Sequence, residues 1–328
     1  MARVLSGIQP TGDIHLGNYL GAVRNWVEDQ HLQDSYFCVV DLHAITIPRD
    51  PAELRAKTLE LTLLLVAAGL DPDVCTLFVQ GHVHEHSELS WILECVASMG
   101  ELERMTQFKE KAKDGRESAR VALFTYPVLQ AADILLYDAE RVPVGEDQRQ
   151  HLELCRDIAL RFNHRYGDTF LVPEAILPKV GARIMDLQKP TAKMSKSADS
   201  PQGTVLVLDE PAVIERKFKR AVTDTGTEVA FDPGKKPGVS NLLAILAAAT
   251  GRQPAEVAEG YSQYGQLKAD TADAVVELLR PVRERYTELA SDPEAVRATL
   301  RQGAEKAQAV AGPTLARARA AIGLLSRD

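Results

Sequence analysis

Cysteine is scarce in this chain of 328 residues and follows no metal-binding pattern. The four cysteines are Cys38, Cys75, Cys95 and Cys155, and no two of them form a CxxC pair. Zinc sites, iron–sulfur clusters and disulfide frameworks need closely spaced or numerous cysteines. We therefore expect core thiols in a reducing, cytoplasmic environment, and no protein-bound zinc or iron–sulfur cluster.

Long apolar runs and an excess of positive charge are missing as well. No stretch approaches the roughly 18 uninterrupted apolar residues of a membrane span, and residues 1–8 lack the pattern of a secretory signal. We expect no membrane partner and no export. Lysine and arginine number 38 against 46 acidic residues, a net charge of −8, so contact with nucleic acid needs a local basic patch.

The first half of the chain alternates short apolar runs with helical patterns. The runs lack polar alternation, which predicts strands of a parallel sheet buried on both faces. The expected strands are residues 4–8, 36–40, 76–79 and 141–144. Residues 16–27 form an apolar helical face, and Asp50 and Glu53 predict a capped helix start. We expect an α/β fold with a Rossmann-like, doubly wound domain over residues 1–187, whose ligands bind beyond the carboxyl ends of the strands.

The pattern changes after residue 187. Residues 188–203 are polar and contain two prolines, which is typical of a mobile connector. Apart from a possible short strand at 205–208, the remainder predicts helices. These are residues 211–222, 240–250, 271–291 and 293–325. We expect a smaller all-helical C-terminal domain over residues 204–292, and a last helix at 293–328 that can pack back on the first domain.

The first expected strand leads into a glycine-bearing turn and then into His15-Leu16-Gly17-Asn18 at a helix start. Backbone N–H groups and the helix dipole can hold phosphate at such a place. The turn has P-loop glycine spacing, but Asp13-Ile14 follows it instead of Lys-Ser/Thr, and GxGxxG is absent. Walker ATPases and Rossmann dehydrogenases lose support. From this segment alone, a purely structural role for His15 and Gly17 stays open.

A second motif, Lys193-Met194-Ser195-Lys196-Ser197, lies inside the polar connector. Two lysines separated by small hydroxyl residues can neutralise the charge that develops on departing pyrophosphate. The alternative is a solvated basic loop.

Together these motifs resemble the two signatures of class I aminoacyl-tRNA synthetases, with Asn18 where the class-wide form has a second histidine. Further matches, at residues 6–12, 18–22, 100–111, 131–137, 142–148, 178–185 and 236–241, resemble the bacterial tryptophanyl-tRNA synthetase family. The resemblance implies a ligase that forms tryptophanyl-adenylate and pyrophosphate from L-tryptophan and ATP with Mg²⁺, then esterifies the 3′-terminal ribose of tRNA(Trp). It also implies that the first domain is catalytic, that the helical domain helps recognise the anticodon, and that the enzyme is a homodimer.

The resemblance also implies site residues. His15, Lys193 and Lys196 are the expected catalytic residues. The expected ATP contacts are Gln9, Pro10, Thr11, Gly17, Asn18, Gly145, Glu146, Asp147, Ile184, Lys193, Met194, Ser195, Lys196 and Ser197. The expected tryptophan contacts are Asp133, Gln107, Tyr126, Gln148, Gln130 and Leu5. Leu5 and Gln130 stand where relatives often carry Phe and Met, which leaves the packing of the indole ring open.

Asp133 can also be argued physically. It lies on an apolar helical face, where a carboxylate needs a hydrogen-bond donor. An indole N–H would serve, and a site built around one hydrogen bond rejects substrates that lack it. A capping or ion-paired structural aspartate is the alternative.

Three other functions stay open: a tyrosyl enzyme, a small nucleotidyltransferase, and a synthetase-like binding protein without catalysis. A basic strip on the last helices is a further candidate for contact with tRNA phosphates, although such strips are usually solvated helix faces. Its members are Arg297, Arg301, Lys306, Arg317, Arg319 and Arg327.

Overall fold

The computed structural model describes residues 2–111, 120–143, 145, 148–176, 183–195 and 201–326. Within these residues, parallel strands form a five-stranded sheet in the order β3-β2-β1-β4-β5. The strands are β1 (Arg3–Ile8), β2 (Asp34–Val39), β3 (Thr76–Val79), β4 (Arg141–Pro143) and β5 (Glu174–Ile176). The strand order reverses between β1 and β4, which is where open α/β sheets bind ligands.

The four strands expected from the sequence are confirmed, with small shifts at their ends. The possible strand at 205–208 is wrong. Leu206 makes one antiparallel bridge with His15, and the Asp209 carboxylate then accepts the Leu206 N–H at 2.8 Å and closes a turn. β5 was not expected, because its three residues form a partly exposed edge with no apolar run.

Alternate side chains of the sheet enter two apolar cores. Phe37 and Val39 of β2 pack into a core shared with α2 and α4, whereas Tyr36 and Cys38 face a core shared with α5, α8, α9 and α14. The helical segments here are α1 (Leu16–Asn18), the π-helical turn Tyr19–Val23, α2 (Arg24–Asp29), α3 (Asp41–Ala44), α4 (Pro51–Ala67), the 3-10 turn Gln80–His82, α5 (Glu85–Glu94), α6 (Met99–Arg104), α7 (Thr106–Lys111), α8 (Val121–Leu135) and α9 (Arg149–Tyr166). The Asp50 carboxylate accepts the Ala52 and Glu53 N–H groups at 2.9 Å, so the expected cap of α4 is confirmed.

The C-terminal third is helical, as expected. It contains the 3-10 turn Pro201–Gly203, α10 (Pro211–Lys219), α11 (Pro237–Thr250), α12 (Pro254–Ala258), α13 (Tyr264–Ala290) and α14 (Pro293–Ala321). Fully buried Ile214, Phe218, Leu242 and Val275 hold α10, α11 and α13 together. The short α12 was not expected, and α13 begins earlier than the periodicity predicted.

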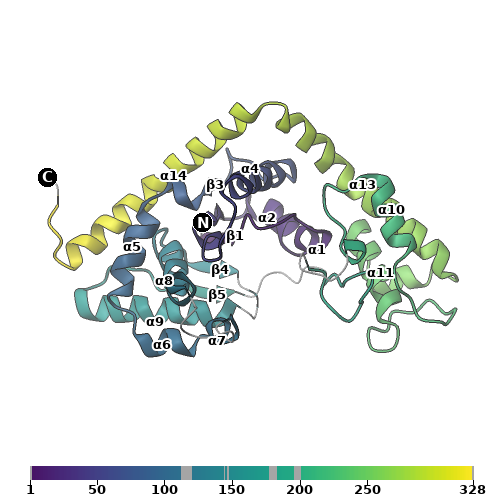
Figure 1. Ribbon diagram of the computed structural model, residues 1–328, viewed down its shortest axis with the longest axis horizontal. Helices are drawn as coiled ribbons and strands as arrows, with labels where there is room; N and C mark the ends of the chain where they lie inside the picture. The colour runs from purple at the N-terminus through teal and green to yellow at the C-terminus, as the bar shows by residue number, and fades with distance from the viewer. Residues whose placement is uncertain are drawn as a thin grey trace.

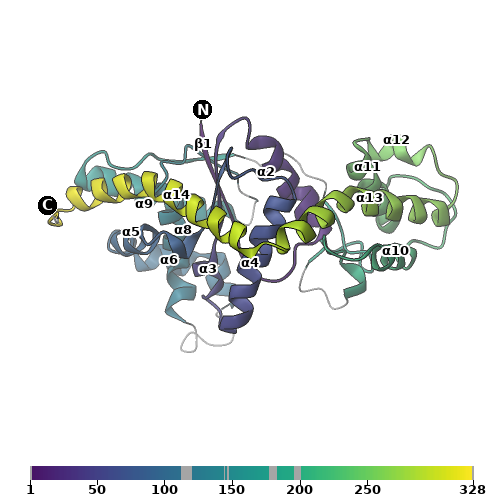
Figure 2. The same ribbon diagram turned by 90° about the horizontal axis from the view of Figure 1, so that it is seen from above.

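The last helix, α14, returns from the helical lobe across the sheet domain (Figures 1 and 2). Gly303 permits this approach, because a Cβ atom there would lie 1.8 Å from the Leu77 carbonyl oxygen of β3. The expected RNA role of the basic strip loses support, since several of its cations bond within the chain. Arg297 pairs with Glu294, Lys306 with the Pro72 carbonyl, Arg317 with Asp138 and Arg319 with Glu88, whereas Arg327 lies outside the described residues.

Cys38, Cys75 and Cys155 are buried, as expected of core thiols. The expectation is wrong for Cys95, which is exposed because it caps the C-terminal end of α5. In the described part of the chain, no helix is both long enough and apolar enough to cross a membrane.

Candidate active site

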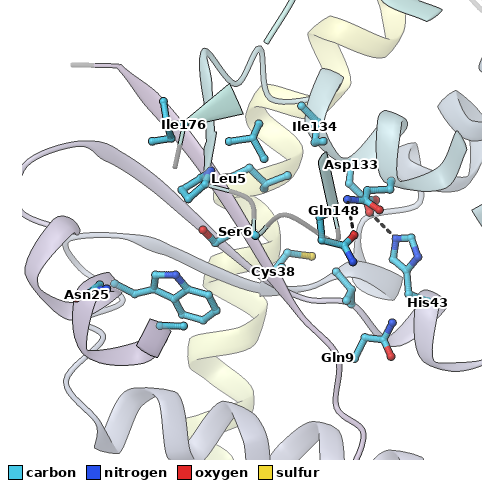
Figure 3. A pocket seen from close by; sticks show the side chains of 18 of the residues that line it. Leu5, Ser6, Gln9, Asn25, Cys38, His43, Asp133, Ile134, Gln148 and Ile176 are labelled. Atoms are coloured by element: carbon cyan, nitrogen blue, oxygen red, sulfur yellow. Dashed lines mark hydrogen bonds and ion pairs between the residues drawn. The ribbon is translucent and has the colours of Figure 1, made fainter. Parts of the chain in front are cut away.

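A cavity of about 570 Å³ extends along β1 and β4 towards their carboxyl ends (Figure 3). It brings together these expected ligand-binding residues: Leu5, Gln9, Tyr126, Gln130, Asp133, Gly145 and Gln148. Other expected ATP contacts that the structure describes do not line it: Pro10, Thr11, His15, Gly17, Asn18, Ile184, Lys193, Met194 and Ser195. The remaining expected positions lie outside the described residues: the side chain of Gln107, and Glu146, Asp147, Lys196 and Ser197.

Asp133 lies on α8 with only 4% of its surface exposed, at one end of the cavity. The expectation that it depends on a ligand for its donor is wrong, because His43 Nε2 donates to Oδ2 at 2.7 Å, and Gln80 Nε2 and His86 Nδ1 donate to Oδ1 at 2.7 and 2.6 Å. Burial acts to raise the pKa of Asp133, but the two histidines outweigh it and hold that pKa below its usual range. Asp133 therefore stays an anion and a pure acceptor.

His151, which the sequence did not single out, organises a second polar group. Its Nδ1 donates to Gln148 Oε1 at 3.1 Å, and its Nε2 lies 3.0 Å from the Tyr126 hydroxyl. Burial raises the pKa of Tyr126 to about 12, so the phenol is neutral. One buried imidazole thus fixes two of the side chains expected near the substrate ammonium group.

The first signature is a reciprocal cap. His15 Nδ1 accepts the Asn18 N–H at 3.2 Å, and Asn18 Oδ1 accepts the His15 N–H at 3.4 Å. Since Nδ1 accepts, a neutral His15 carries its hydrogen on Nε2, which makes that nitrogen a donor suited to phosphate oxygen. The structural role considered above is therefore real, and it also sets the protonation that a phosphate contact needs.

The second signature packs against the first through its connector. Met194 N–H donates to the Ile184 carbonyl at 3.1 Å, and Met194 is 98% buried, being 2% exposed. The side-chain amide of Asn241 on α11 both donates to and accepts from the Met185 backbone, at 2.9 Å each. These contacts fix the backbone around Lys193, whose side chain is exposed.

The family described as tRNA synthetases class I (W and Y) matches residues 1–280. The chain belongs to this family. Among its class I synthetase relatives, the tryptophan–tRNA ligase 1 of Streptomyces coelicolor is 58% identical, with 99% of this chain and 98% of the relative covered. The tryptophan–tRNA ligase of Caldanaerobacter subterraneus subsp. tengcongensis is 53% identical, with 100% of both covered.

Solved structures of this synthetase family agree with the fold. The tryptophanyl-tRNA synthetase of Mycoplasma pneumoniae is 36% identical and superposes with a TM-score of 0.90, covering 100% of this chain and 99% of that one. The Campylobacter jejuni enzyme, crystallised with ADP and tryptophan, is 34% identical with a TM-score of 0.86, covering 98% of this chain and 100% of that one.

Gly17 leaves room for the His15 ring. A Cβ atom at this position would lie 3.1 Å from His15 Nδ1 and 3.6 Å from Ile184 Cβ. We expect Gly17→Ala to displace the imidazole and lower kcat/KM for ATP in this synthetase by roughly tenfold, because a small misplacement of a positioned group is enough to slow the reaction. The KM for the amino acid should change little.

The measurement for Gly17→Ala is amino-acid-dependent ATP–pyrophosphate exchange at varied ATP. The matched control is Gly265→Ala, which adds the same methyl group to the first turn of α13 with nothing within 4 Å. Unchanged ATP kinetics in Gly17→Ala would contradict the positioning of His15 by Gly17.

Proposed function

We propose that this chain is a tryptophan–tRNA ligase whose cavity binds L-tryptophan. The observation that carries this proposal is Asp133, an anionic acceptor at the end of the cavity, 4% exposed and already bonded by three protein donors. A carboxylate offers about four acceptor positions, so one position remains for an indole N–H. The names of the relatives, and the tryptophan bound in the Campylobacter jejuni structure, support the same substrate.

In the proposed complex, the indole lies between Leu5 and Gln130 and donates to Asp133. Tyr126 and Gln148, with Gln107, face the substrate ammonium group. The sheet edge at Gly145 leads to the adenosine, which Glu146 and Asp147 help to hold. The other nucleotide contacts are Gln9, Pro10, Thr11, Asn18, Ile184, Met194, Ser195 and Ser197.

Activation then needs no side-chain nucleophile. The tryptophan carboxylate attacks the α-phosphorus of ATP, forming tryptophanyl-adenylate and releasing pyrophosphate. His15 Nε2 and the start of the adjoining helix hold phosphate oxygens, and Lys193 and Lys196 stabilise the leaving group. Mg²⁺ enters with ATP as part of the substrate, bound through phosphate oxygens. In the ranges that the structure describes, no three His, Cys, Asp or Glu side chains gather into a metal site.

Transfer follows to the 3′-terminal ribose of tRNA(Trp), in the cytoplasm. We propose that residues 1–187 form the catalytic domain, that residues 188–203 act as a mobile connector, and that residues 204–292 recognise the anticodon. The test is charging of tRNA(Trp) and tRNA(Tyr) transcripts with labelled tryptophan or tyrosine. Tryptophan esterified to tRNA(Trp) alone is the expected result, and tyrosine on tRNA(Tyr) would move the protein to the tyrosyl branch.

The proposed homodimer needs an apolar face, and one is exposed on α5, α6 and α8. Trp91, Met99 and Val121 are 68%, 67% and 77% exposed, and Met99 and Val121 line one groove of about 540 Å³. Exposed apolar side chains grouped in this way mark interfaces, and a second copy presenting the same face would bury them. We expect Met99→Asp to shift the protein from dimer to monomer in sedimentation velocity. Val74→Asp, at another exposed apolar residue, should remain dimeric; a wild-type monomer at micromolar concentration would contradict the proposal.

A further inference from the structure

A buried polar chain contacts Asp133 from outside the cavity lining. His86 Nδ1 donates to Asp133 Oδ1 at 2.6 Å, Gln80 Nε2 donates to the same oxygen at 2.7 Å, and His86 Nε2 lies 2.7 Å from the Tyr137 hydroxyl. His86, Gln80 and Tyr137 are each 0% exposed, and none of the three lines the cavity. They hold Asp133 without reaching a ligand.

The hydrogen bonds fix where each proton lies. A carboxylate only accepts, so His86 Nδ1 carries a hydrogen, and the neutral ring then accepts the Tyr137 O–H at Nε2. Burial first, and then the nearby Cys38 and Asp133, raise the pKa of Tyr137, so its hydroxyl keeps its proton. The Leu42 N–H donates to Gln80 Oε1 at 3.1 Å, which turns Gln80 Nε2 towards Asp133.

The contacts divide the two carboxylate oxygens between protein and ligand. His86 and Gln80 fill both acceptor positions of Oδ1, whereas His43 fills one position of Oδ2. We propose that His86, oriented by Tyr137, is a specificity-determining positioning residue. By occupying Oδ1, it leaves the second position of Oδ2 for the ligand and so makes a ring N–H the group that the cavity selects. This inference rests on the proposed assignment of Asp133 to the indole N–H.

Two substitutions at His86 separate donation from packing. In His86→Leu the donor disappears, and the buried carboxylate must rotate or take up a proton, so that it no longer presents a fixed acceptor to the ligand. His86→Asn keeps a donor, because the asparagine amide nitrogen is attached to Cγ just as Nδ1 is. A merely structural role would make both variants less stable without changing which ligand is preferred.

The experiment compares L-tryptophan with its benzothiophene analogue, in which sulfur replaces the indole N–H. The measured quantity is the ratio of kcat/KM values for the two amino acids in ATP–pyrophosphate exchange. We expect the wild-type ratio to be on the order of a hundredfold or more. His86→Leu should lower this ratio at least tenfold, and His86→Asn should stay within about threefold of wild type. Leu93→Ala, a fully buried truncation on the same helix, should lower thermal stability and leave the ratio unchanged.

The outcomes distinguish this inference from the function on which it rests. A wild-type ratio near one would remove the assignment of Asp133 itself. A high wild-type ratio that persists in folded His86→Leu, or that falls equally in Leu93→Ala, would overturn the role of His86 alone. If His86→Leu does not fold, Tyr137→Phe carries the test: the loss of one hydroxyl should lower the ratio roughly threefold, and an unchanged ratio would overturn the proposal.

Discussion

Asp133→Asn is expected to lower kcat/KM for tryptophan activation by on the order of a hundredfold to a thousandfold. The reason is geometric. Two donors point at Oδ1 and one at Oδ2, so an asparagine amide must turn its N–H₂ group towards a donor whichever way it is placed. The acceptor position left for the indole N–H is lost at the same time. Steady-state ATP–pyrophosphate exchange at varied tryptophan measures the effect.

The control for Asp133→Asn is Asp138→Asn. Asp138 pairs with Arg317 at 2.9 Å near the surface and has no contact with the cavity, so activity should stay near wild type. The KM for ATP should change little in Asp133→Asn, since the adenosine contacts come from other elements. Tryptophan kinetics within threefold of wild type would contradict the assignment of Asp133.

Lys193→Ala is expected to slow formation of the adenylate by about a hundredfold to a thousandfold, with little change in tryptophan binding. The Lys193 side chain is exposed, while the buried Met194 and the Met185 pairing hold the backbone on either side. The substitution therefore removes a charge without removing packing. Single-turnover measurement of adenylate formation separates this step from binding.

Lys189→Ala provides the matched comparison, because Lys189 is an exposed lysine of the same connector outside the signature. It should activate tryptophan at nearly the wild-type rate. Lys196→Ala should behave like Lys193→Ala, an expectation that rests on the signature alone because Lys196 lies outside the described residues. Equal rates in Lys193→Ala and Lys189→Ala would contradict electrostatic stabilisation of pyrophosphate by Lys193.

The sequence predicted the elements whose signal is local. β1 to β4 are continuous apolar runs, and α4 carries its own cap and first-turn proline, so both were found. β5 and α12 are short and have no apolar period of their own; they form because neighbouring elements supply a strand or a core. The segment at 205–208 looked like a strand because it is apolar, but its side chains fill a core rather than a sheet.

The candidate site was only partly predictable. Motif matching supplied Asp133, Tyr126 and Gln148, which the fold brings together around one cavity. His43 and Gln80 carried a usable signal, because each follows the carboxyl end of a buried strand, where α/β sheets bind ligands. His86 and His151 carried none, because their roles depend on partners 47 and 25 residues away in the sequence.

Membership of the class I family removes the small nucleotidyltransferase considered at first, and the long helical C-terminal third agrees with that conclusion. Two alternatives remain for experiment, a tyrosyl enzyme and a binding protein without catalysis. The intact His15 and Lys193 favour catalysis, and the acceptor at Asp133 favours indole.

Amino-acid-dependent ATP–pyrophosphate exchange, measured with each of the twenty amino acids, tests the central claim most directly, because it reports reaction class and substrate together. The account predicts exchange with tryptophan and none above background with the other nineteen. Exchange driven by tyrosine, or no exchange with any amino acid, would contradict it.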